Sequence, residues 1–203
     1  MPSLASNHPS IRSLLHGVGL PEDFFFNLSR ESDWSLIIKL HALFEAVLAS
    51  LILKRLGKPE LEELIANLDF NNVKSGKVAF ARSLGLIDKK EVAFLRGLSE
   101  LRNRLVHNIS NVSFEVETYV SAHTASEKKK FKTEFGQAIC ALPNGNQEYE
   151  SMLMSTPRNI VIMAGYLCLM ELQYQMTMSQ RNLIVEVLLR RQSEKDGNWR
   201  MPP

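Results

Sequence analysis

The sequence has little of what marks several common protein classes. Only two of its 203 residues are cysteine, and Cys140 and Cys168 both lie in apolar stretches, so we expect buried free thiols rather than a disulfide or a zinc site. The net charge is only +2, whereas a dedicated nucleic-acid-binding protein usually has a larger basic excess, although a local patch can hold a phosphate backbone. We expect a cytoplasmic protein with no metal and no cofactor.

Long apolar runs and several signature loops are also missing. No basic segment followed by an apolar run opens the chain, so we expect no signal peptide. In the most hydrophobic segment, Lys39, His41, Glu45 and Ser50 interrupt any 18-residue apolar stretch, and we expect no membrane span. The sequence has no Gly-rich phosphate loop, no G-x-S-x-G turn and no recognisable DNA-reading helix-turn-helix, so direct operator binding is not expected.

What the sequence does have is helical periodicity, which predicts an all-α fold, a bundle of about six to eight helices in a single domain. We expect an N-terminal extension over 1–30, the helical bundle over 31–192 and a disordered tail over 193–203. Three aromatic residues in a row, Phe24 to Phe26, must pack either onto the bundle or onto a second subunit.

Capping residues predict where the helices begin and end. Ser32 or Asp33 starts a long helix that ends at Leu56, before Gly57. Thr156 and Pro157 start a strongly apolar helix. The other predicted helices span 10–16, 61–68, 77–84, 88–107, 114–120, 124–140 and 179–192, and the last of these continues or restarts the helix before it.

The helix that ends near His107 carries an anomaly. Phe94, Leu98, Leu101 and Leu105 form one apolar stripe, and Arg102 lies only about 40° from Leu98 around the helix, inside that stripe. An unpaired guanidinium there would be costly, so it needs an acidic partner or an anion.

A second anomaly is Glu45, a carboxylate on the long apolar helix. We hypothesise that Glu45 supports Arg102 structurally by pairing with it, and Arg82 is the other candidate partner. His41 and Glu45 are also four residues apart, a spacing that favours a structural hydrogen bond over a two-ligand metal site. Gly97, inside the helix predicted over 88–107, indicates close approach of another helix, and the same helix of a second subunit is one option.

The run from Arg102 and Asn103 to His107, Arg-Asn-x3-His, resembles the signature of the HEPN superfamily of helical-bundle proteins. Many members are metal-independent endoribonucleases, often toxins or antiviral effectors, in which two protomers bring their Arg and His together. The resemblance implies Arg102 and His107 as catalytic residues, with Asn103 as the polar residue beside the arginine. It also implies a homodimer with an up-down helical core, an RNA substrate and a cognate antitoxin or regulatory protein as partners.

A longer stretch resembles the mannitol operon repressor family, helical proteins of related architecture. The similar segments are HALFEAVLASLIL (41–53), ARSLGLID (81–88) and LRGLSELRNRLVHN (95–108), which together cover roughly residues 34 to 108. Members of this family are not generally regarded as nucleases. This second resemblance implies a non-catalytic protein of transcription regulation that acts through protein contacts.

The chemistry of RNA cleavage would suit these residue types. The 2′-hydroxyl can attack the neighbouring phosphate if a base removes its proton, an acid protonates the leaving oxygen and a cation offsets the developing charge. His107 suits either proton role, Arg102 could hold a non-bridging oxygen, and Asn103 could orient His107. However, Arg102 and His107 differ by about 140° around an ideal helix, so either the helix unwinds or two subunits share the site. The plain alternative is that His107 stabilises the helix end and Arg102 neutralises Glu45.

One further basic cluster lies on the helix predicted over 124–140. Two interpretations stay open, a patch that contacts an RNA backbone or an ordinary solvated helix face. The cluster consists of Lys128, Lys129, Lys130 and Lys132.

Overall fold

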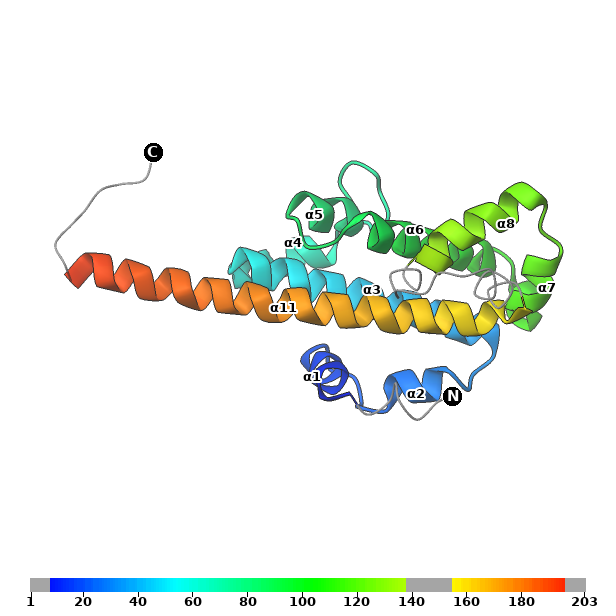
Figure 1. The fold of residues 1–203 in the computed structure, drawn as a ribbon, viewed down its shortest axis with the longest axis horizontal. Helices are drawn as coiled ribbons and strands as arrows, with labels where there is room; N and C mark the ends of the chain where they lie inside the picture. Colours follow the sequence, from blue (N-terminus) through cyan, green and yellow to red (C-terminus); the bar gives the residue numbers. More distant parts are fainter. Residues whose placement is uncertain (1–7, 138–154, 196–203) are drawn as a thin grey trace.

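The computed structural model describes residues 8–137 and 155–195, and the secondary structure of these residues is helical throughout, with no strand (Figure 1). The prediction of an all-α helical bundle is therefore confirmed. In chain order the elements are α1 (Pro9–Gly17), α2 (Phe24–Leu28), α3 (Asp33–Leu56), η1 (Pro59–Leu61), α4 (Glu62–Ala66), α5 (Lys77–Ser83), α6 (Lys89–Val106), η2 (Ile109–Ser113), α7 (Val116–Ser121), α8 (Ala125–Phe131), the π-helical turn η3 (Lys132–Gly136) and α11 (Pro157–Lys195).

Helix α3 is the central element, and it begins and ends where its capping residues predict. The Ser32 hydroxyl accepts a hydrogen bond from the Ser35 amide at 3.4 Å, and Gly57 adopts a left-handed φ of 61° after the last turn. Helices α4, α5, α6 and α11 all pack against α3. By length and composition α3 is the one described helix that could cross a membrane, but 56% of its most apolar window is buried inside the protein, as in the core helix of a bundle.

The hydrophobic core is continuous from α3 to η3. The rings of Phe44 on α3 and Phe94 on α6 lie 5.2 Å apart, and Phe94 meets Phe135 of η3 edge-on at 5.8 Å. Helix α6 starts with a capping box, in which Glu91 accepts from the Asp88 amide at 2.8 Å. These contacts fix the helix that carries the Arg-Asn-x3-His motif against the centre of the bundle.

The segment expected as an N-terminal extension contains two helices that pack on the bundle. Helix α1 lies against α11 and α2 against α3. Phe25 is buried, and its ring lies 5.9 Å from that of Tyr166 on α11. The central phenylalanine of the aromatic triplet therefore packs onto its own chain.

A polar clamp joins the starts of α3, α7 and α11. Asp33 accepts a hydrogen bond from the Val116 amide at 2.7 Å and pairs with Arg158. Arg158 also donates to the backbone carbonyls of Ser29, at 3.0 Å, and Glu31, at 2.6 Å. The start of α7 is thereby held beside the first turn of α11.

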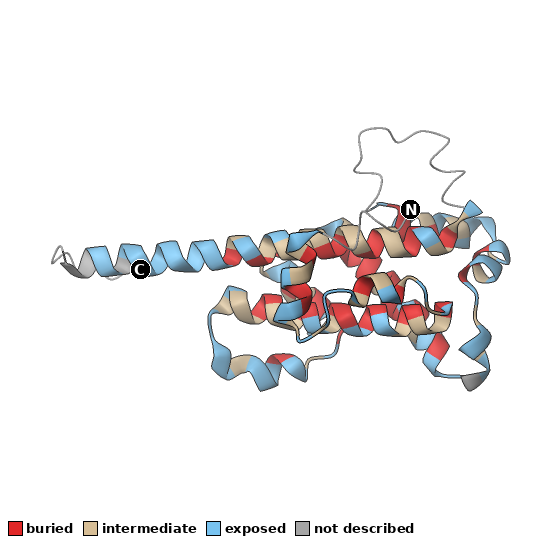
Figure 2. Ribbon diagram, turned by 90° about the horizontal axis from the view of Figure 1, so that it is seen from below, coloured by how far each residue is buried: buried red, intermediate tan, exposed pale blue. Residues whose placement is uncertain are grey.

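Helix α11 runs unbroken for 39 residues, so the segment 179–192 continues the helix that starts at Pro157 and does not restart it. Its C-terminal part extends beyond the rest of the molecule, and Figure 2 shows that part exposed on all sides. Residues 193–195, expected in the tail, belong to this helix. The rest of that tail and Cys140 lie outside the described residues, whereas Cys168 is a buried free thiol, as predicted.

Candidate functional site

The motif lies on the last turns of α6. Arg102 is half-buried, and its Nη1 donates to Oδ1 of the neighbouring Asn103 at 3.0 Å. His107 is the C-cap residue of the helix and is exposed. The two catalytic candidates make no hydrogen bond to each other, and Asn103 contacts Arg102 rather than His107.

The predicted pairing of Glu45 with Arg102 or Arg82 is wrong. Glu45 pairs instead with Lys77, the first residue of α5, at 2.9 Å. The Lys77 side chain is only 1% exposed, and its ammonium also donates to the carbonyls of Ala66, at 2.9 Å, and Leu68, at 2.7 Å. A buried ammonium needs such a set of acceptors, and Glu45 supplies the charged one.

As a result, Glu45 does not neutralise the charge of Arg102. Among the described residues no carboxylate lies within 4.0 Å of its guanidinium. The charge of Arg102 acts on His41 of α3. His41 is buried, and its ring lies 4.4 Å from that of Phe70. Burial, and then the charge of Arg102, lower the pKa of His41 to about 4. In 8–137 and 155–195 no group of three or more His, Cys, Asp or Glu side chains could hold a metal ion.

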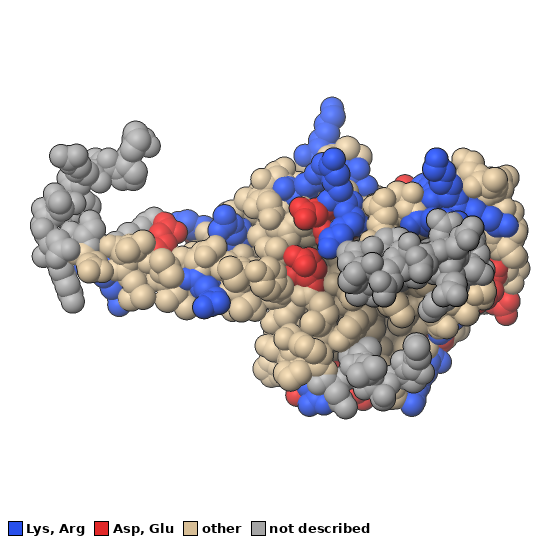
Figure 3. Space-filling view, in the orientation of Figure 1, with Lys and Arg blue, Asp and Glu red and all other residues tan. Residues whose placement is uncertain are grey.

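The basic cluster on α8 is partly engaged within the chain. Lys130 lies 2.5 Å from Glu100 of α6 and 3.5 Å from Glu134 of η3. The hydrogen bond to Glu100 raises the pKa of Lys130, and burial raises that of Glu134. Figure 3 shows basic side chains gathered over α8. Lys129 is exposed, and Lys128 and Lys132 are half-buried, so an RNA-binding role of this patch stays a prediction.

Glu134 also accounts for Gly97. A Cβ atom added at Gly97 would lie 2.8 Å from the Cβ of Glu134, so only glycine lets η3 approach α6 this closely. The predicted close approach at Gly97 is confirmed, and the neighbour is a helical turn of the same chain.

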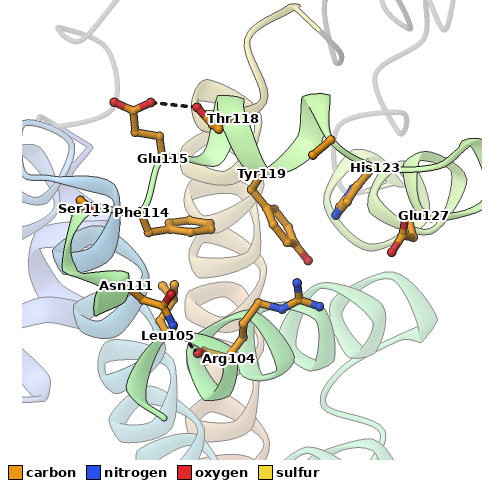
Figure 4. Close-up of a pocket in the computed structure, with 11 residues that line it drawn as sticks. Arg104, Leu105, Asn111, Ser113, Phe114, Glu115, Thr118, Tyr119, His123 and Glu127 are labelled. Carbon is orange, nitrogen blue, oxygen red and sulfur yellow. Dashed lines mark hydrogen bonds between the residues drawn. The ribbon is translucent and has the colours of Figure 1, made fainter. Parts of the chain in front are cut away.

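A cleft lies between α6, η2, α7 and α8, beside the motif. It consists of a cavity of about 490 Å³ and an adjoining one of about 110 Å³, and both are lined by Arg104, Tyr119, His123 and Glu127. Figure 4 shows these side chains pointing toward one another from α6 and from the α7 to α8 segment. The Arg104 guanidinium lies over the Tyr119 ring, 5.0 Å from its centroid.

The titratable groups of this cleft are perturbed by their surroundings. Burial lowers the pKa of His123 and raises that of Tyr119. The two rings meet edge-on at 4.3 Å, and Nδ1 of His123 is buried without a hydrogen-bond partner in the part of the chain that the structure describes. A cavity lined by several groups with shifted pKa values is a candidate ligand-binding site.

Sequence reasoning did not identify this cleft. Arg104 lies within the motif, but the motif assigns it no role. Tyr119 and His123 are four residues apart, yet α7 ends at Ser121 and only the bend that follows turns His123 toward Tyr119. The four-residue spacing of Tyr119 and His123 could have indicated that the two side chains lie close together. Their proximity to Arg104 of α6 depends on the tertiary fold and could not be read from the sequence.

Comparisons with protein-family models, with curated proteins and with solved structures find no match to this chain.

Proposed function

We propose that this protein is a HEPN-like endoribonuclease that acts as a homodimer and cleaves RNA with Arg102 and His107. The observation that carries the proposal is the environment of Arg102, a half-buried cation whose one hydrogen-bonded neighbour among the described residues is the neutral amide of Asn103. Because Lys77 neutralises Glu45, the charge of Arg102 is available to a phosphate. His107 is exposed at the end of the same helix, where an RNA strand can reach it.

In this reaction the imidazole of His107 removes the proton of a 2′-hydroxyl, and the oxygen attacks the adjacent phosphorus. The bond from phosphorus to the 5′-oxygen breaks, and that oxygen takes a proton from the protonated His107 of the other subunit. Arg102 stabilises the charge on the non-bridging oxygens. The products are a 2′,3′-cyclic phosphate and a 5′-hydroxyl. A cognate antitoxin or other regulatory protein would control such an activity.

The test is cleavage of end-labelled RNA by purified protein in the presence of EDTA. We expect wild type to produce cyclic-phosphate ends, and His107→Ala and Arg102→Ala to lose at least about 100-fold in rate. His16→Ala, which removes an exposed histidine at the end of α1, is the matched control and should cleave normally. Intact RNA with wild type, or equal cleavage by His107→Ala, would reject the proposal.

A specific feature favours a second candidate, a non-catalytic regulator that acts through protein contacts. The projecting part of α11 exposes six aliphatic side chains by 39% to 61%, an unusual number for a solvated helix. We call this the projecting segment, and its exposed residues are Leu183, Ile184, Val185, Val187, Leu188 and Leu189.

A second copy of the chain is the partner that this segment fits best. If two projecting segments pack antiparallel, Ile184, Val187 and Leu188, which share one face of the helix at i, i+3 and i+4, can pack against the same face of the partner.

The two candidates require different dimers. Asp33 holds Val116, the first residue of α7 and nine residues after His107, beside Arg158, and at 1.5 Å per residue the projecting segment begins about 40 Å farther along α11. Pairing through that segment would place the two motifs at opposite ends of the dimer, so a shared Arg102/His107 site needs another interface.

Sedimentation velocity of Leu188→Glu separates the two dimers. If the projecting segment is the interface, this variant is monomeric while Leu64→Glu, an equally exposed leucine on α4, remains dimeric. If Leu188→Glu remains dimeric and still cleaves RNA, the shared site lies at a different interface and the second candidate fails.

A further inference from the structure

The cleft beside the motif has flat walls that suit a planar ring. Phe114 and Tyr119 lie 5.4 Å apart, and the Arg104 guanidinium covers Tyr119. Aromatic rings and arginine planes are the surfaces on which the bases of single-stranded nucleic acids stack. Figure 4 shows the cavity opening between Phe114, Tyr119 and Arg104.

The charge of the lining argues against an anion inside the cleft. The larger cavity has one cationic side chain, Arg104, and two carboxylates, Glu115 and Glu127. The smaller one adds Lys130 together with Glu100 and Glu134. Because carboxylates exceed cations, a phosphate is disfavoured, while a ring that carries an amino group finds acceptors.

The remaining polar groups match the edge of such a ring. His123 lines both cavities, and its buried Nδ1 has no hydrogen-bond partner among the described residues, so the imidazole can offer this atom to a ligand when the ring turns toward it. Ser113 and Thr118 present hydroxyl groups in the larger cavity. The site therefore offers both donors and acceptors around an aromatic surface.

We propose that the cleft between α6, η2, α7 and α8 binds a nucleobase that carries an exocyclic amino group, with the base stacked on the Tyr119 and Arg104 wall and its sugar and phosphate outside. The larger cavity, about 490 Å³, has room for a nucleoside. This inference does not depend on RNA cleavage, because a free nucleoside is enough to occupy the site.

The test is titration of the full chain with adenosine, followed by backbone amide NMR shifts and calorimetry. We expect saturable binding that shifts the amides of Tyr119 and His123. Uridine has no amino group and should bind about 10-fold more weakly, and inorganic phosphate should neither bind there nor compete.

Variants separate stacking from a general effect on the fold. Tyr119→Leu should weaken adenosine binding about 10-fold or more, whereas Tyr119→Phe keeps the ring and should bind like wild type. Tyr174→Leu is the control, because Tyr174 is 56% exposed on α11 and does not line the cleft. Absence of saturable binding at millimolar adenosine, equal binding of uridine, or unchanged binding by Tyr119→Leu would each overturn the assignment.

Discussion

The ammonium group of Lys77 lies 2.9 Å from Oε1 of Glu45, and this pair joins α5 to the central helix α3. The amine is almost fully buried and also holds the carbonyls that end α4. It is therefore an internal support for the α4 to α5 connection rather than a surface ion pair. It also removes from Arg102 the carboxylate that the sequence had suggested as its partner.

Replacement of Lys77 should be costly for stability. Lys77→Met leaves the Ala66 and Leu68 carbonyls without their donor, and we expect a loss of about 2 to 4 kcal/mol in the free energy of unfolding, measured by urea denaturation. Lys39→Met removes an exposed pair with Glu31 and should change this free energy by less than about 1 kcal/mol. Similar losses in the two variants would contradict the assigned role of Lys77.

The clamp around Arg158 gives a second stability prediction. Arg158→Lys keeps a positive charge but cannot reach Asp33 and the Ser29 and Glu31 carbonyls together. We expect it to lose about 1 to 3 kcal/mol of unfolding free energy, with faster amide hydrogen exchange at Val116, because Asp33 is then less firmly oriented. If the Val116 amide exchanges at the wild-type rate in Arg158→Lys, Asp33 is held by other contacts.

The buried imidazole of His41 predicts how stability depends on pH. Its pKa in the folded protein is about 4, below the unfolded value of 6.5, because of burial and then Arg102. The unfolded chain therefore binds the proton more tightly. The stabilisation is full above pH 6.5 and is lost as the pH falls toward 4, by about 3 kcal/mol in total.

Denaturation of wild type and His41→Leu at several pH values measures this contribution. The variant should show a smaller loss of stability between pH 6.5 and 4, whereas His16→Leu, with an exposed histidine replaced, should behave like wild type. NMR titration adds an independent check, since Arg102→Met should raise the pKa of His41. An unchanged pKa would mean that Arg102 does not act on His41.

The parts of this structure that the sequence predicted are the parts set by local chemistry. Ser32 and Gly57 bound α3, and Asp88 with Glu91 starts α6, because capping needs only neighbouring residues. The partner of Glu45 was missed because Lys77 is 32 residues away and lies at the start of a short helix. The cleft was missed for the same reason, since Arg104 meets Tyr119 only when η2 and α7 turn back over α6.

Gly97 links stability to the shape of the cleft. In Gly97→Ala the new methyl group would lie 2.8 Å from the Glu134 Cβ, so η3 must move away from α6. We expect a loss of about 1 to 3 kcal/mol, measured by thermal and urea denaturation, together with altered amide shifts at Lys130 and Glu134. Gly17→Ala at the end of α1 is the matched control, because nothing lies within 4 Å of its added Cβ, and it should be neutral or slightly stabilising. If Gly97→Ala is as stable as wild type, η3 can move away from α6 at little cost in free energy, and the close contact between them does not hold the cleft in place.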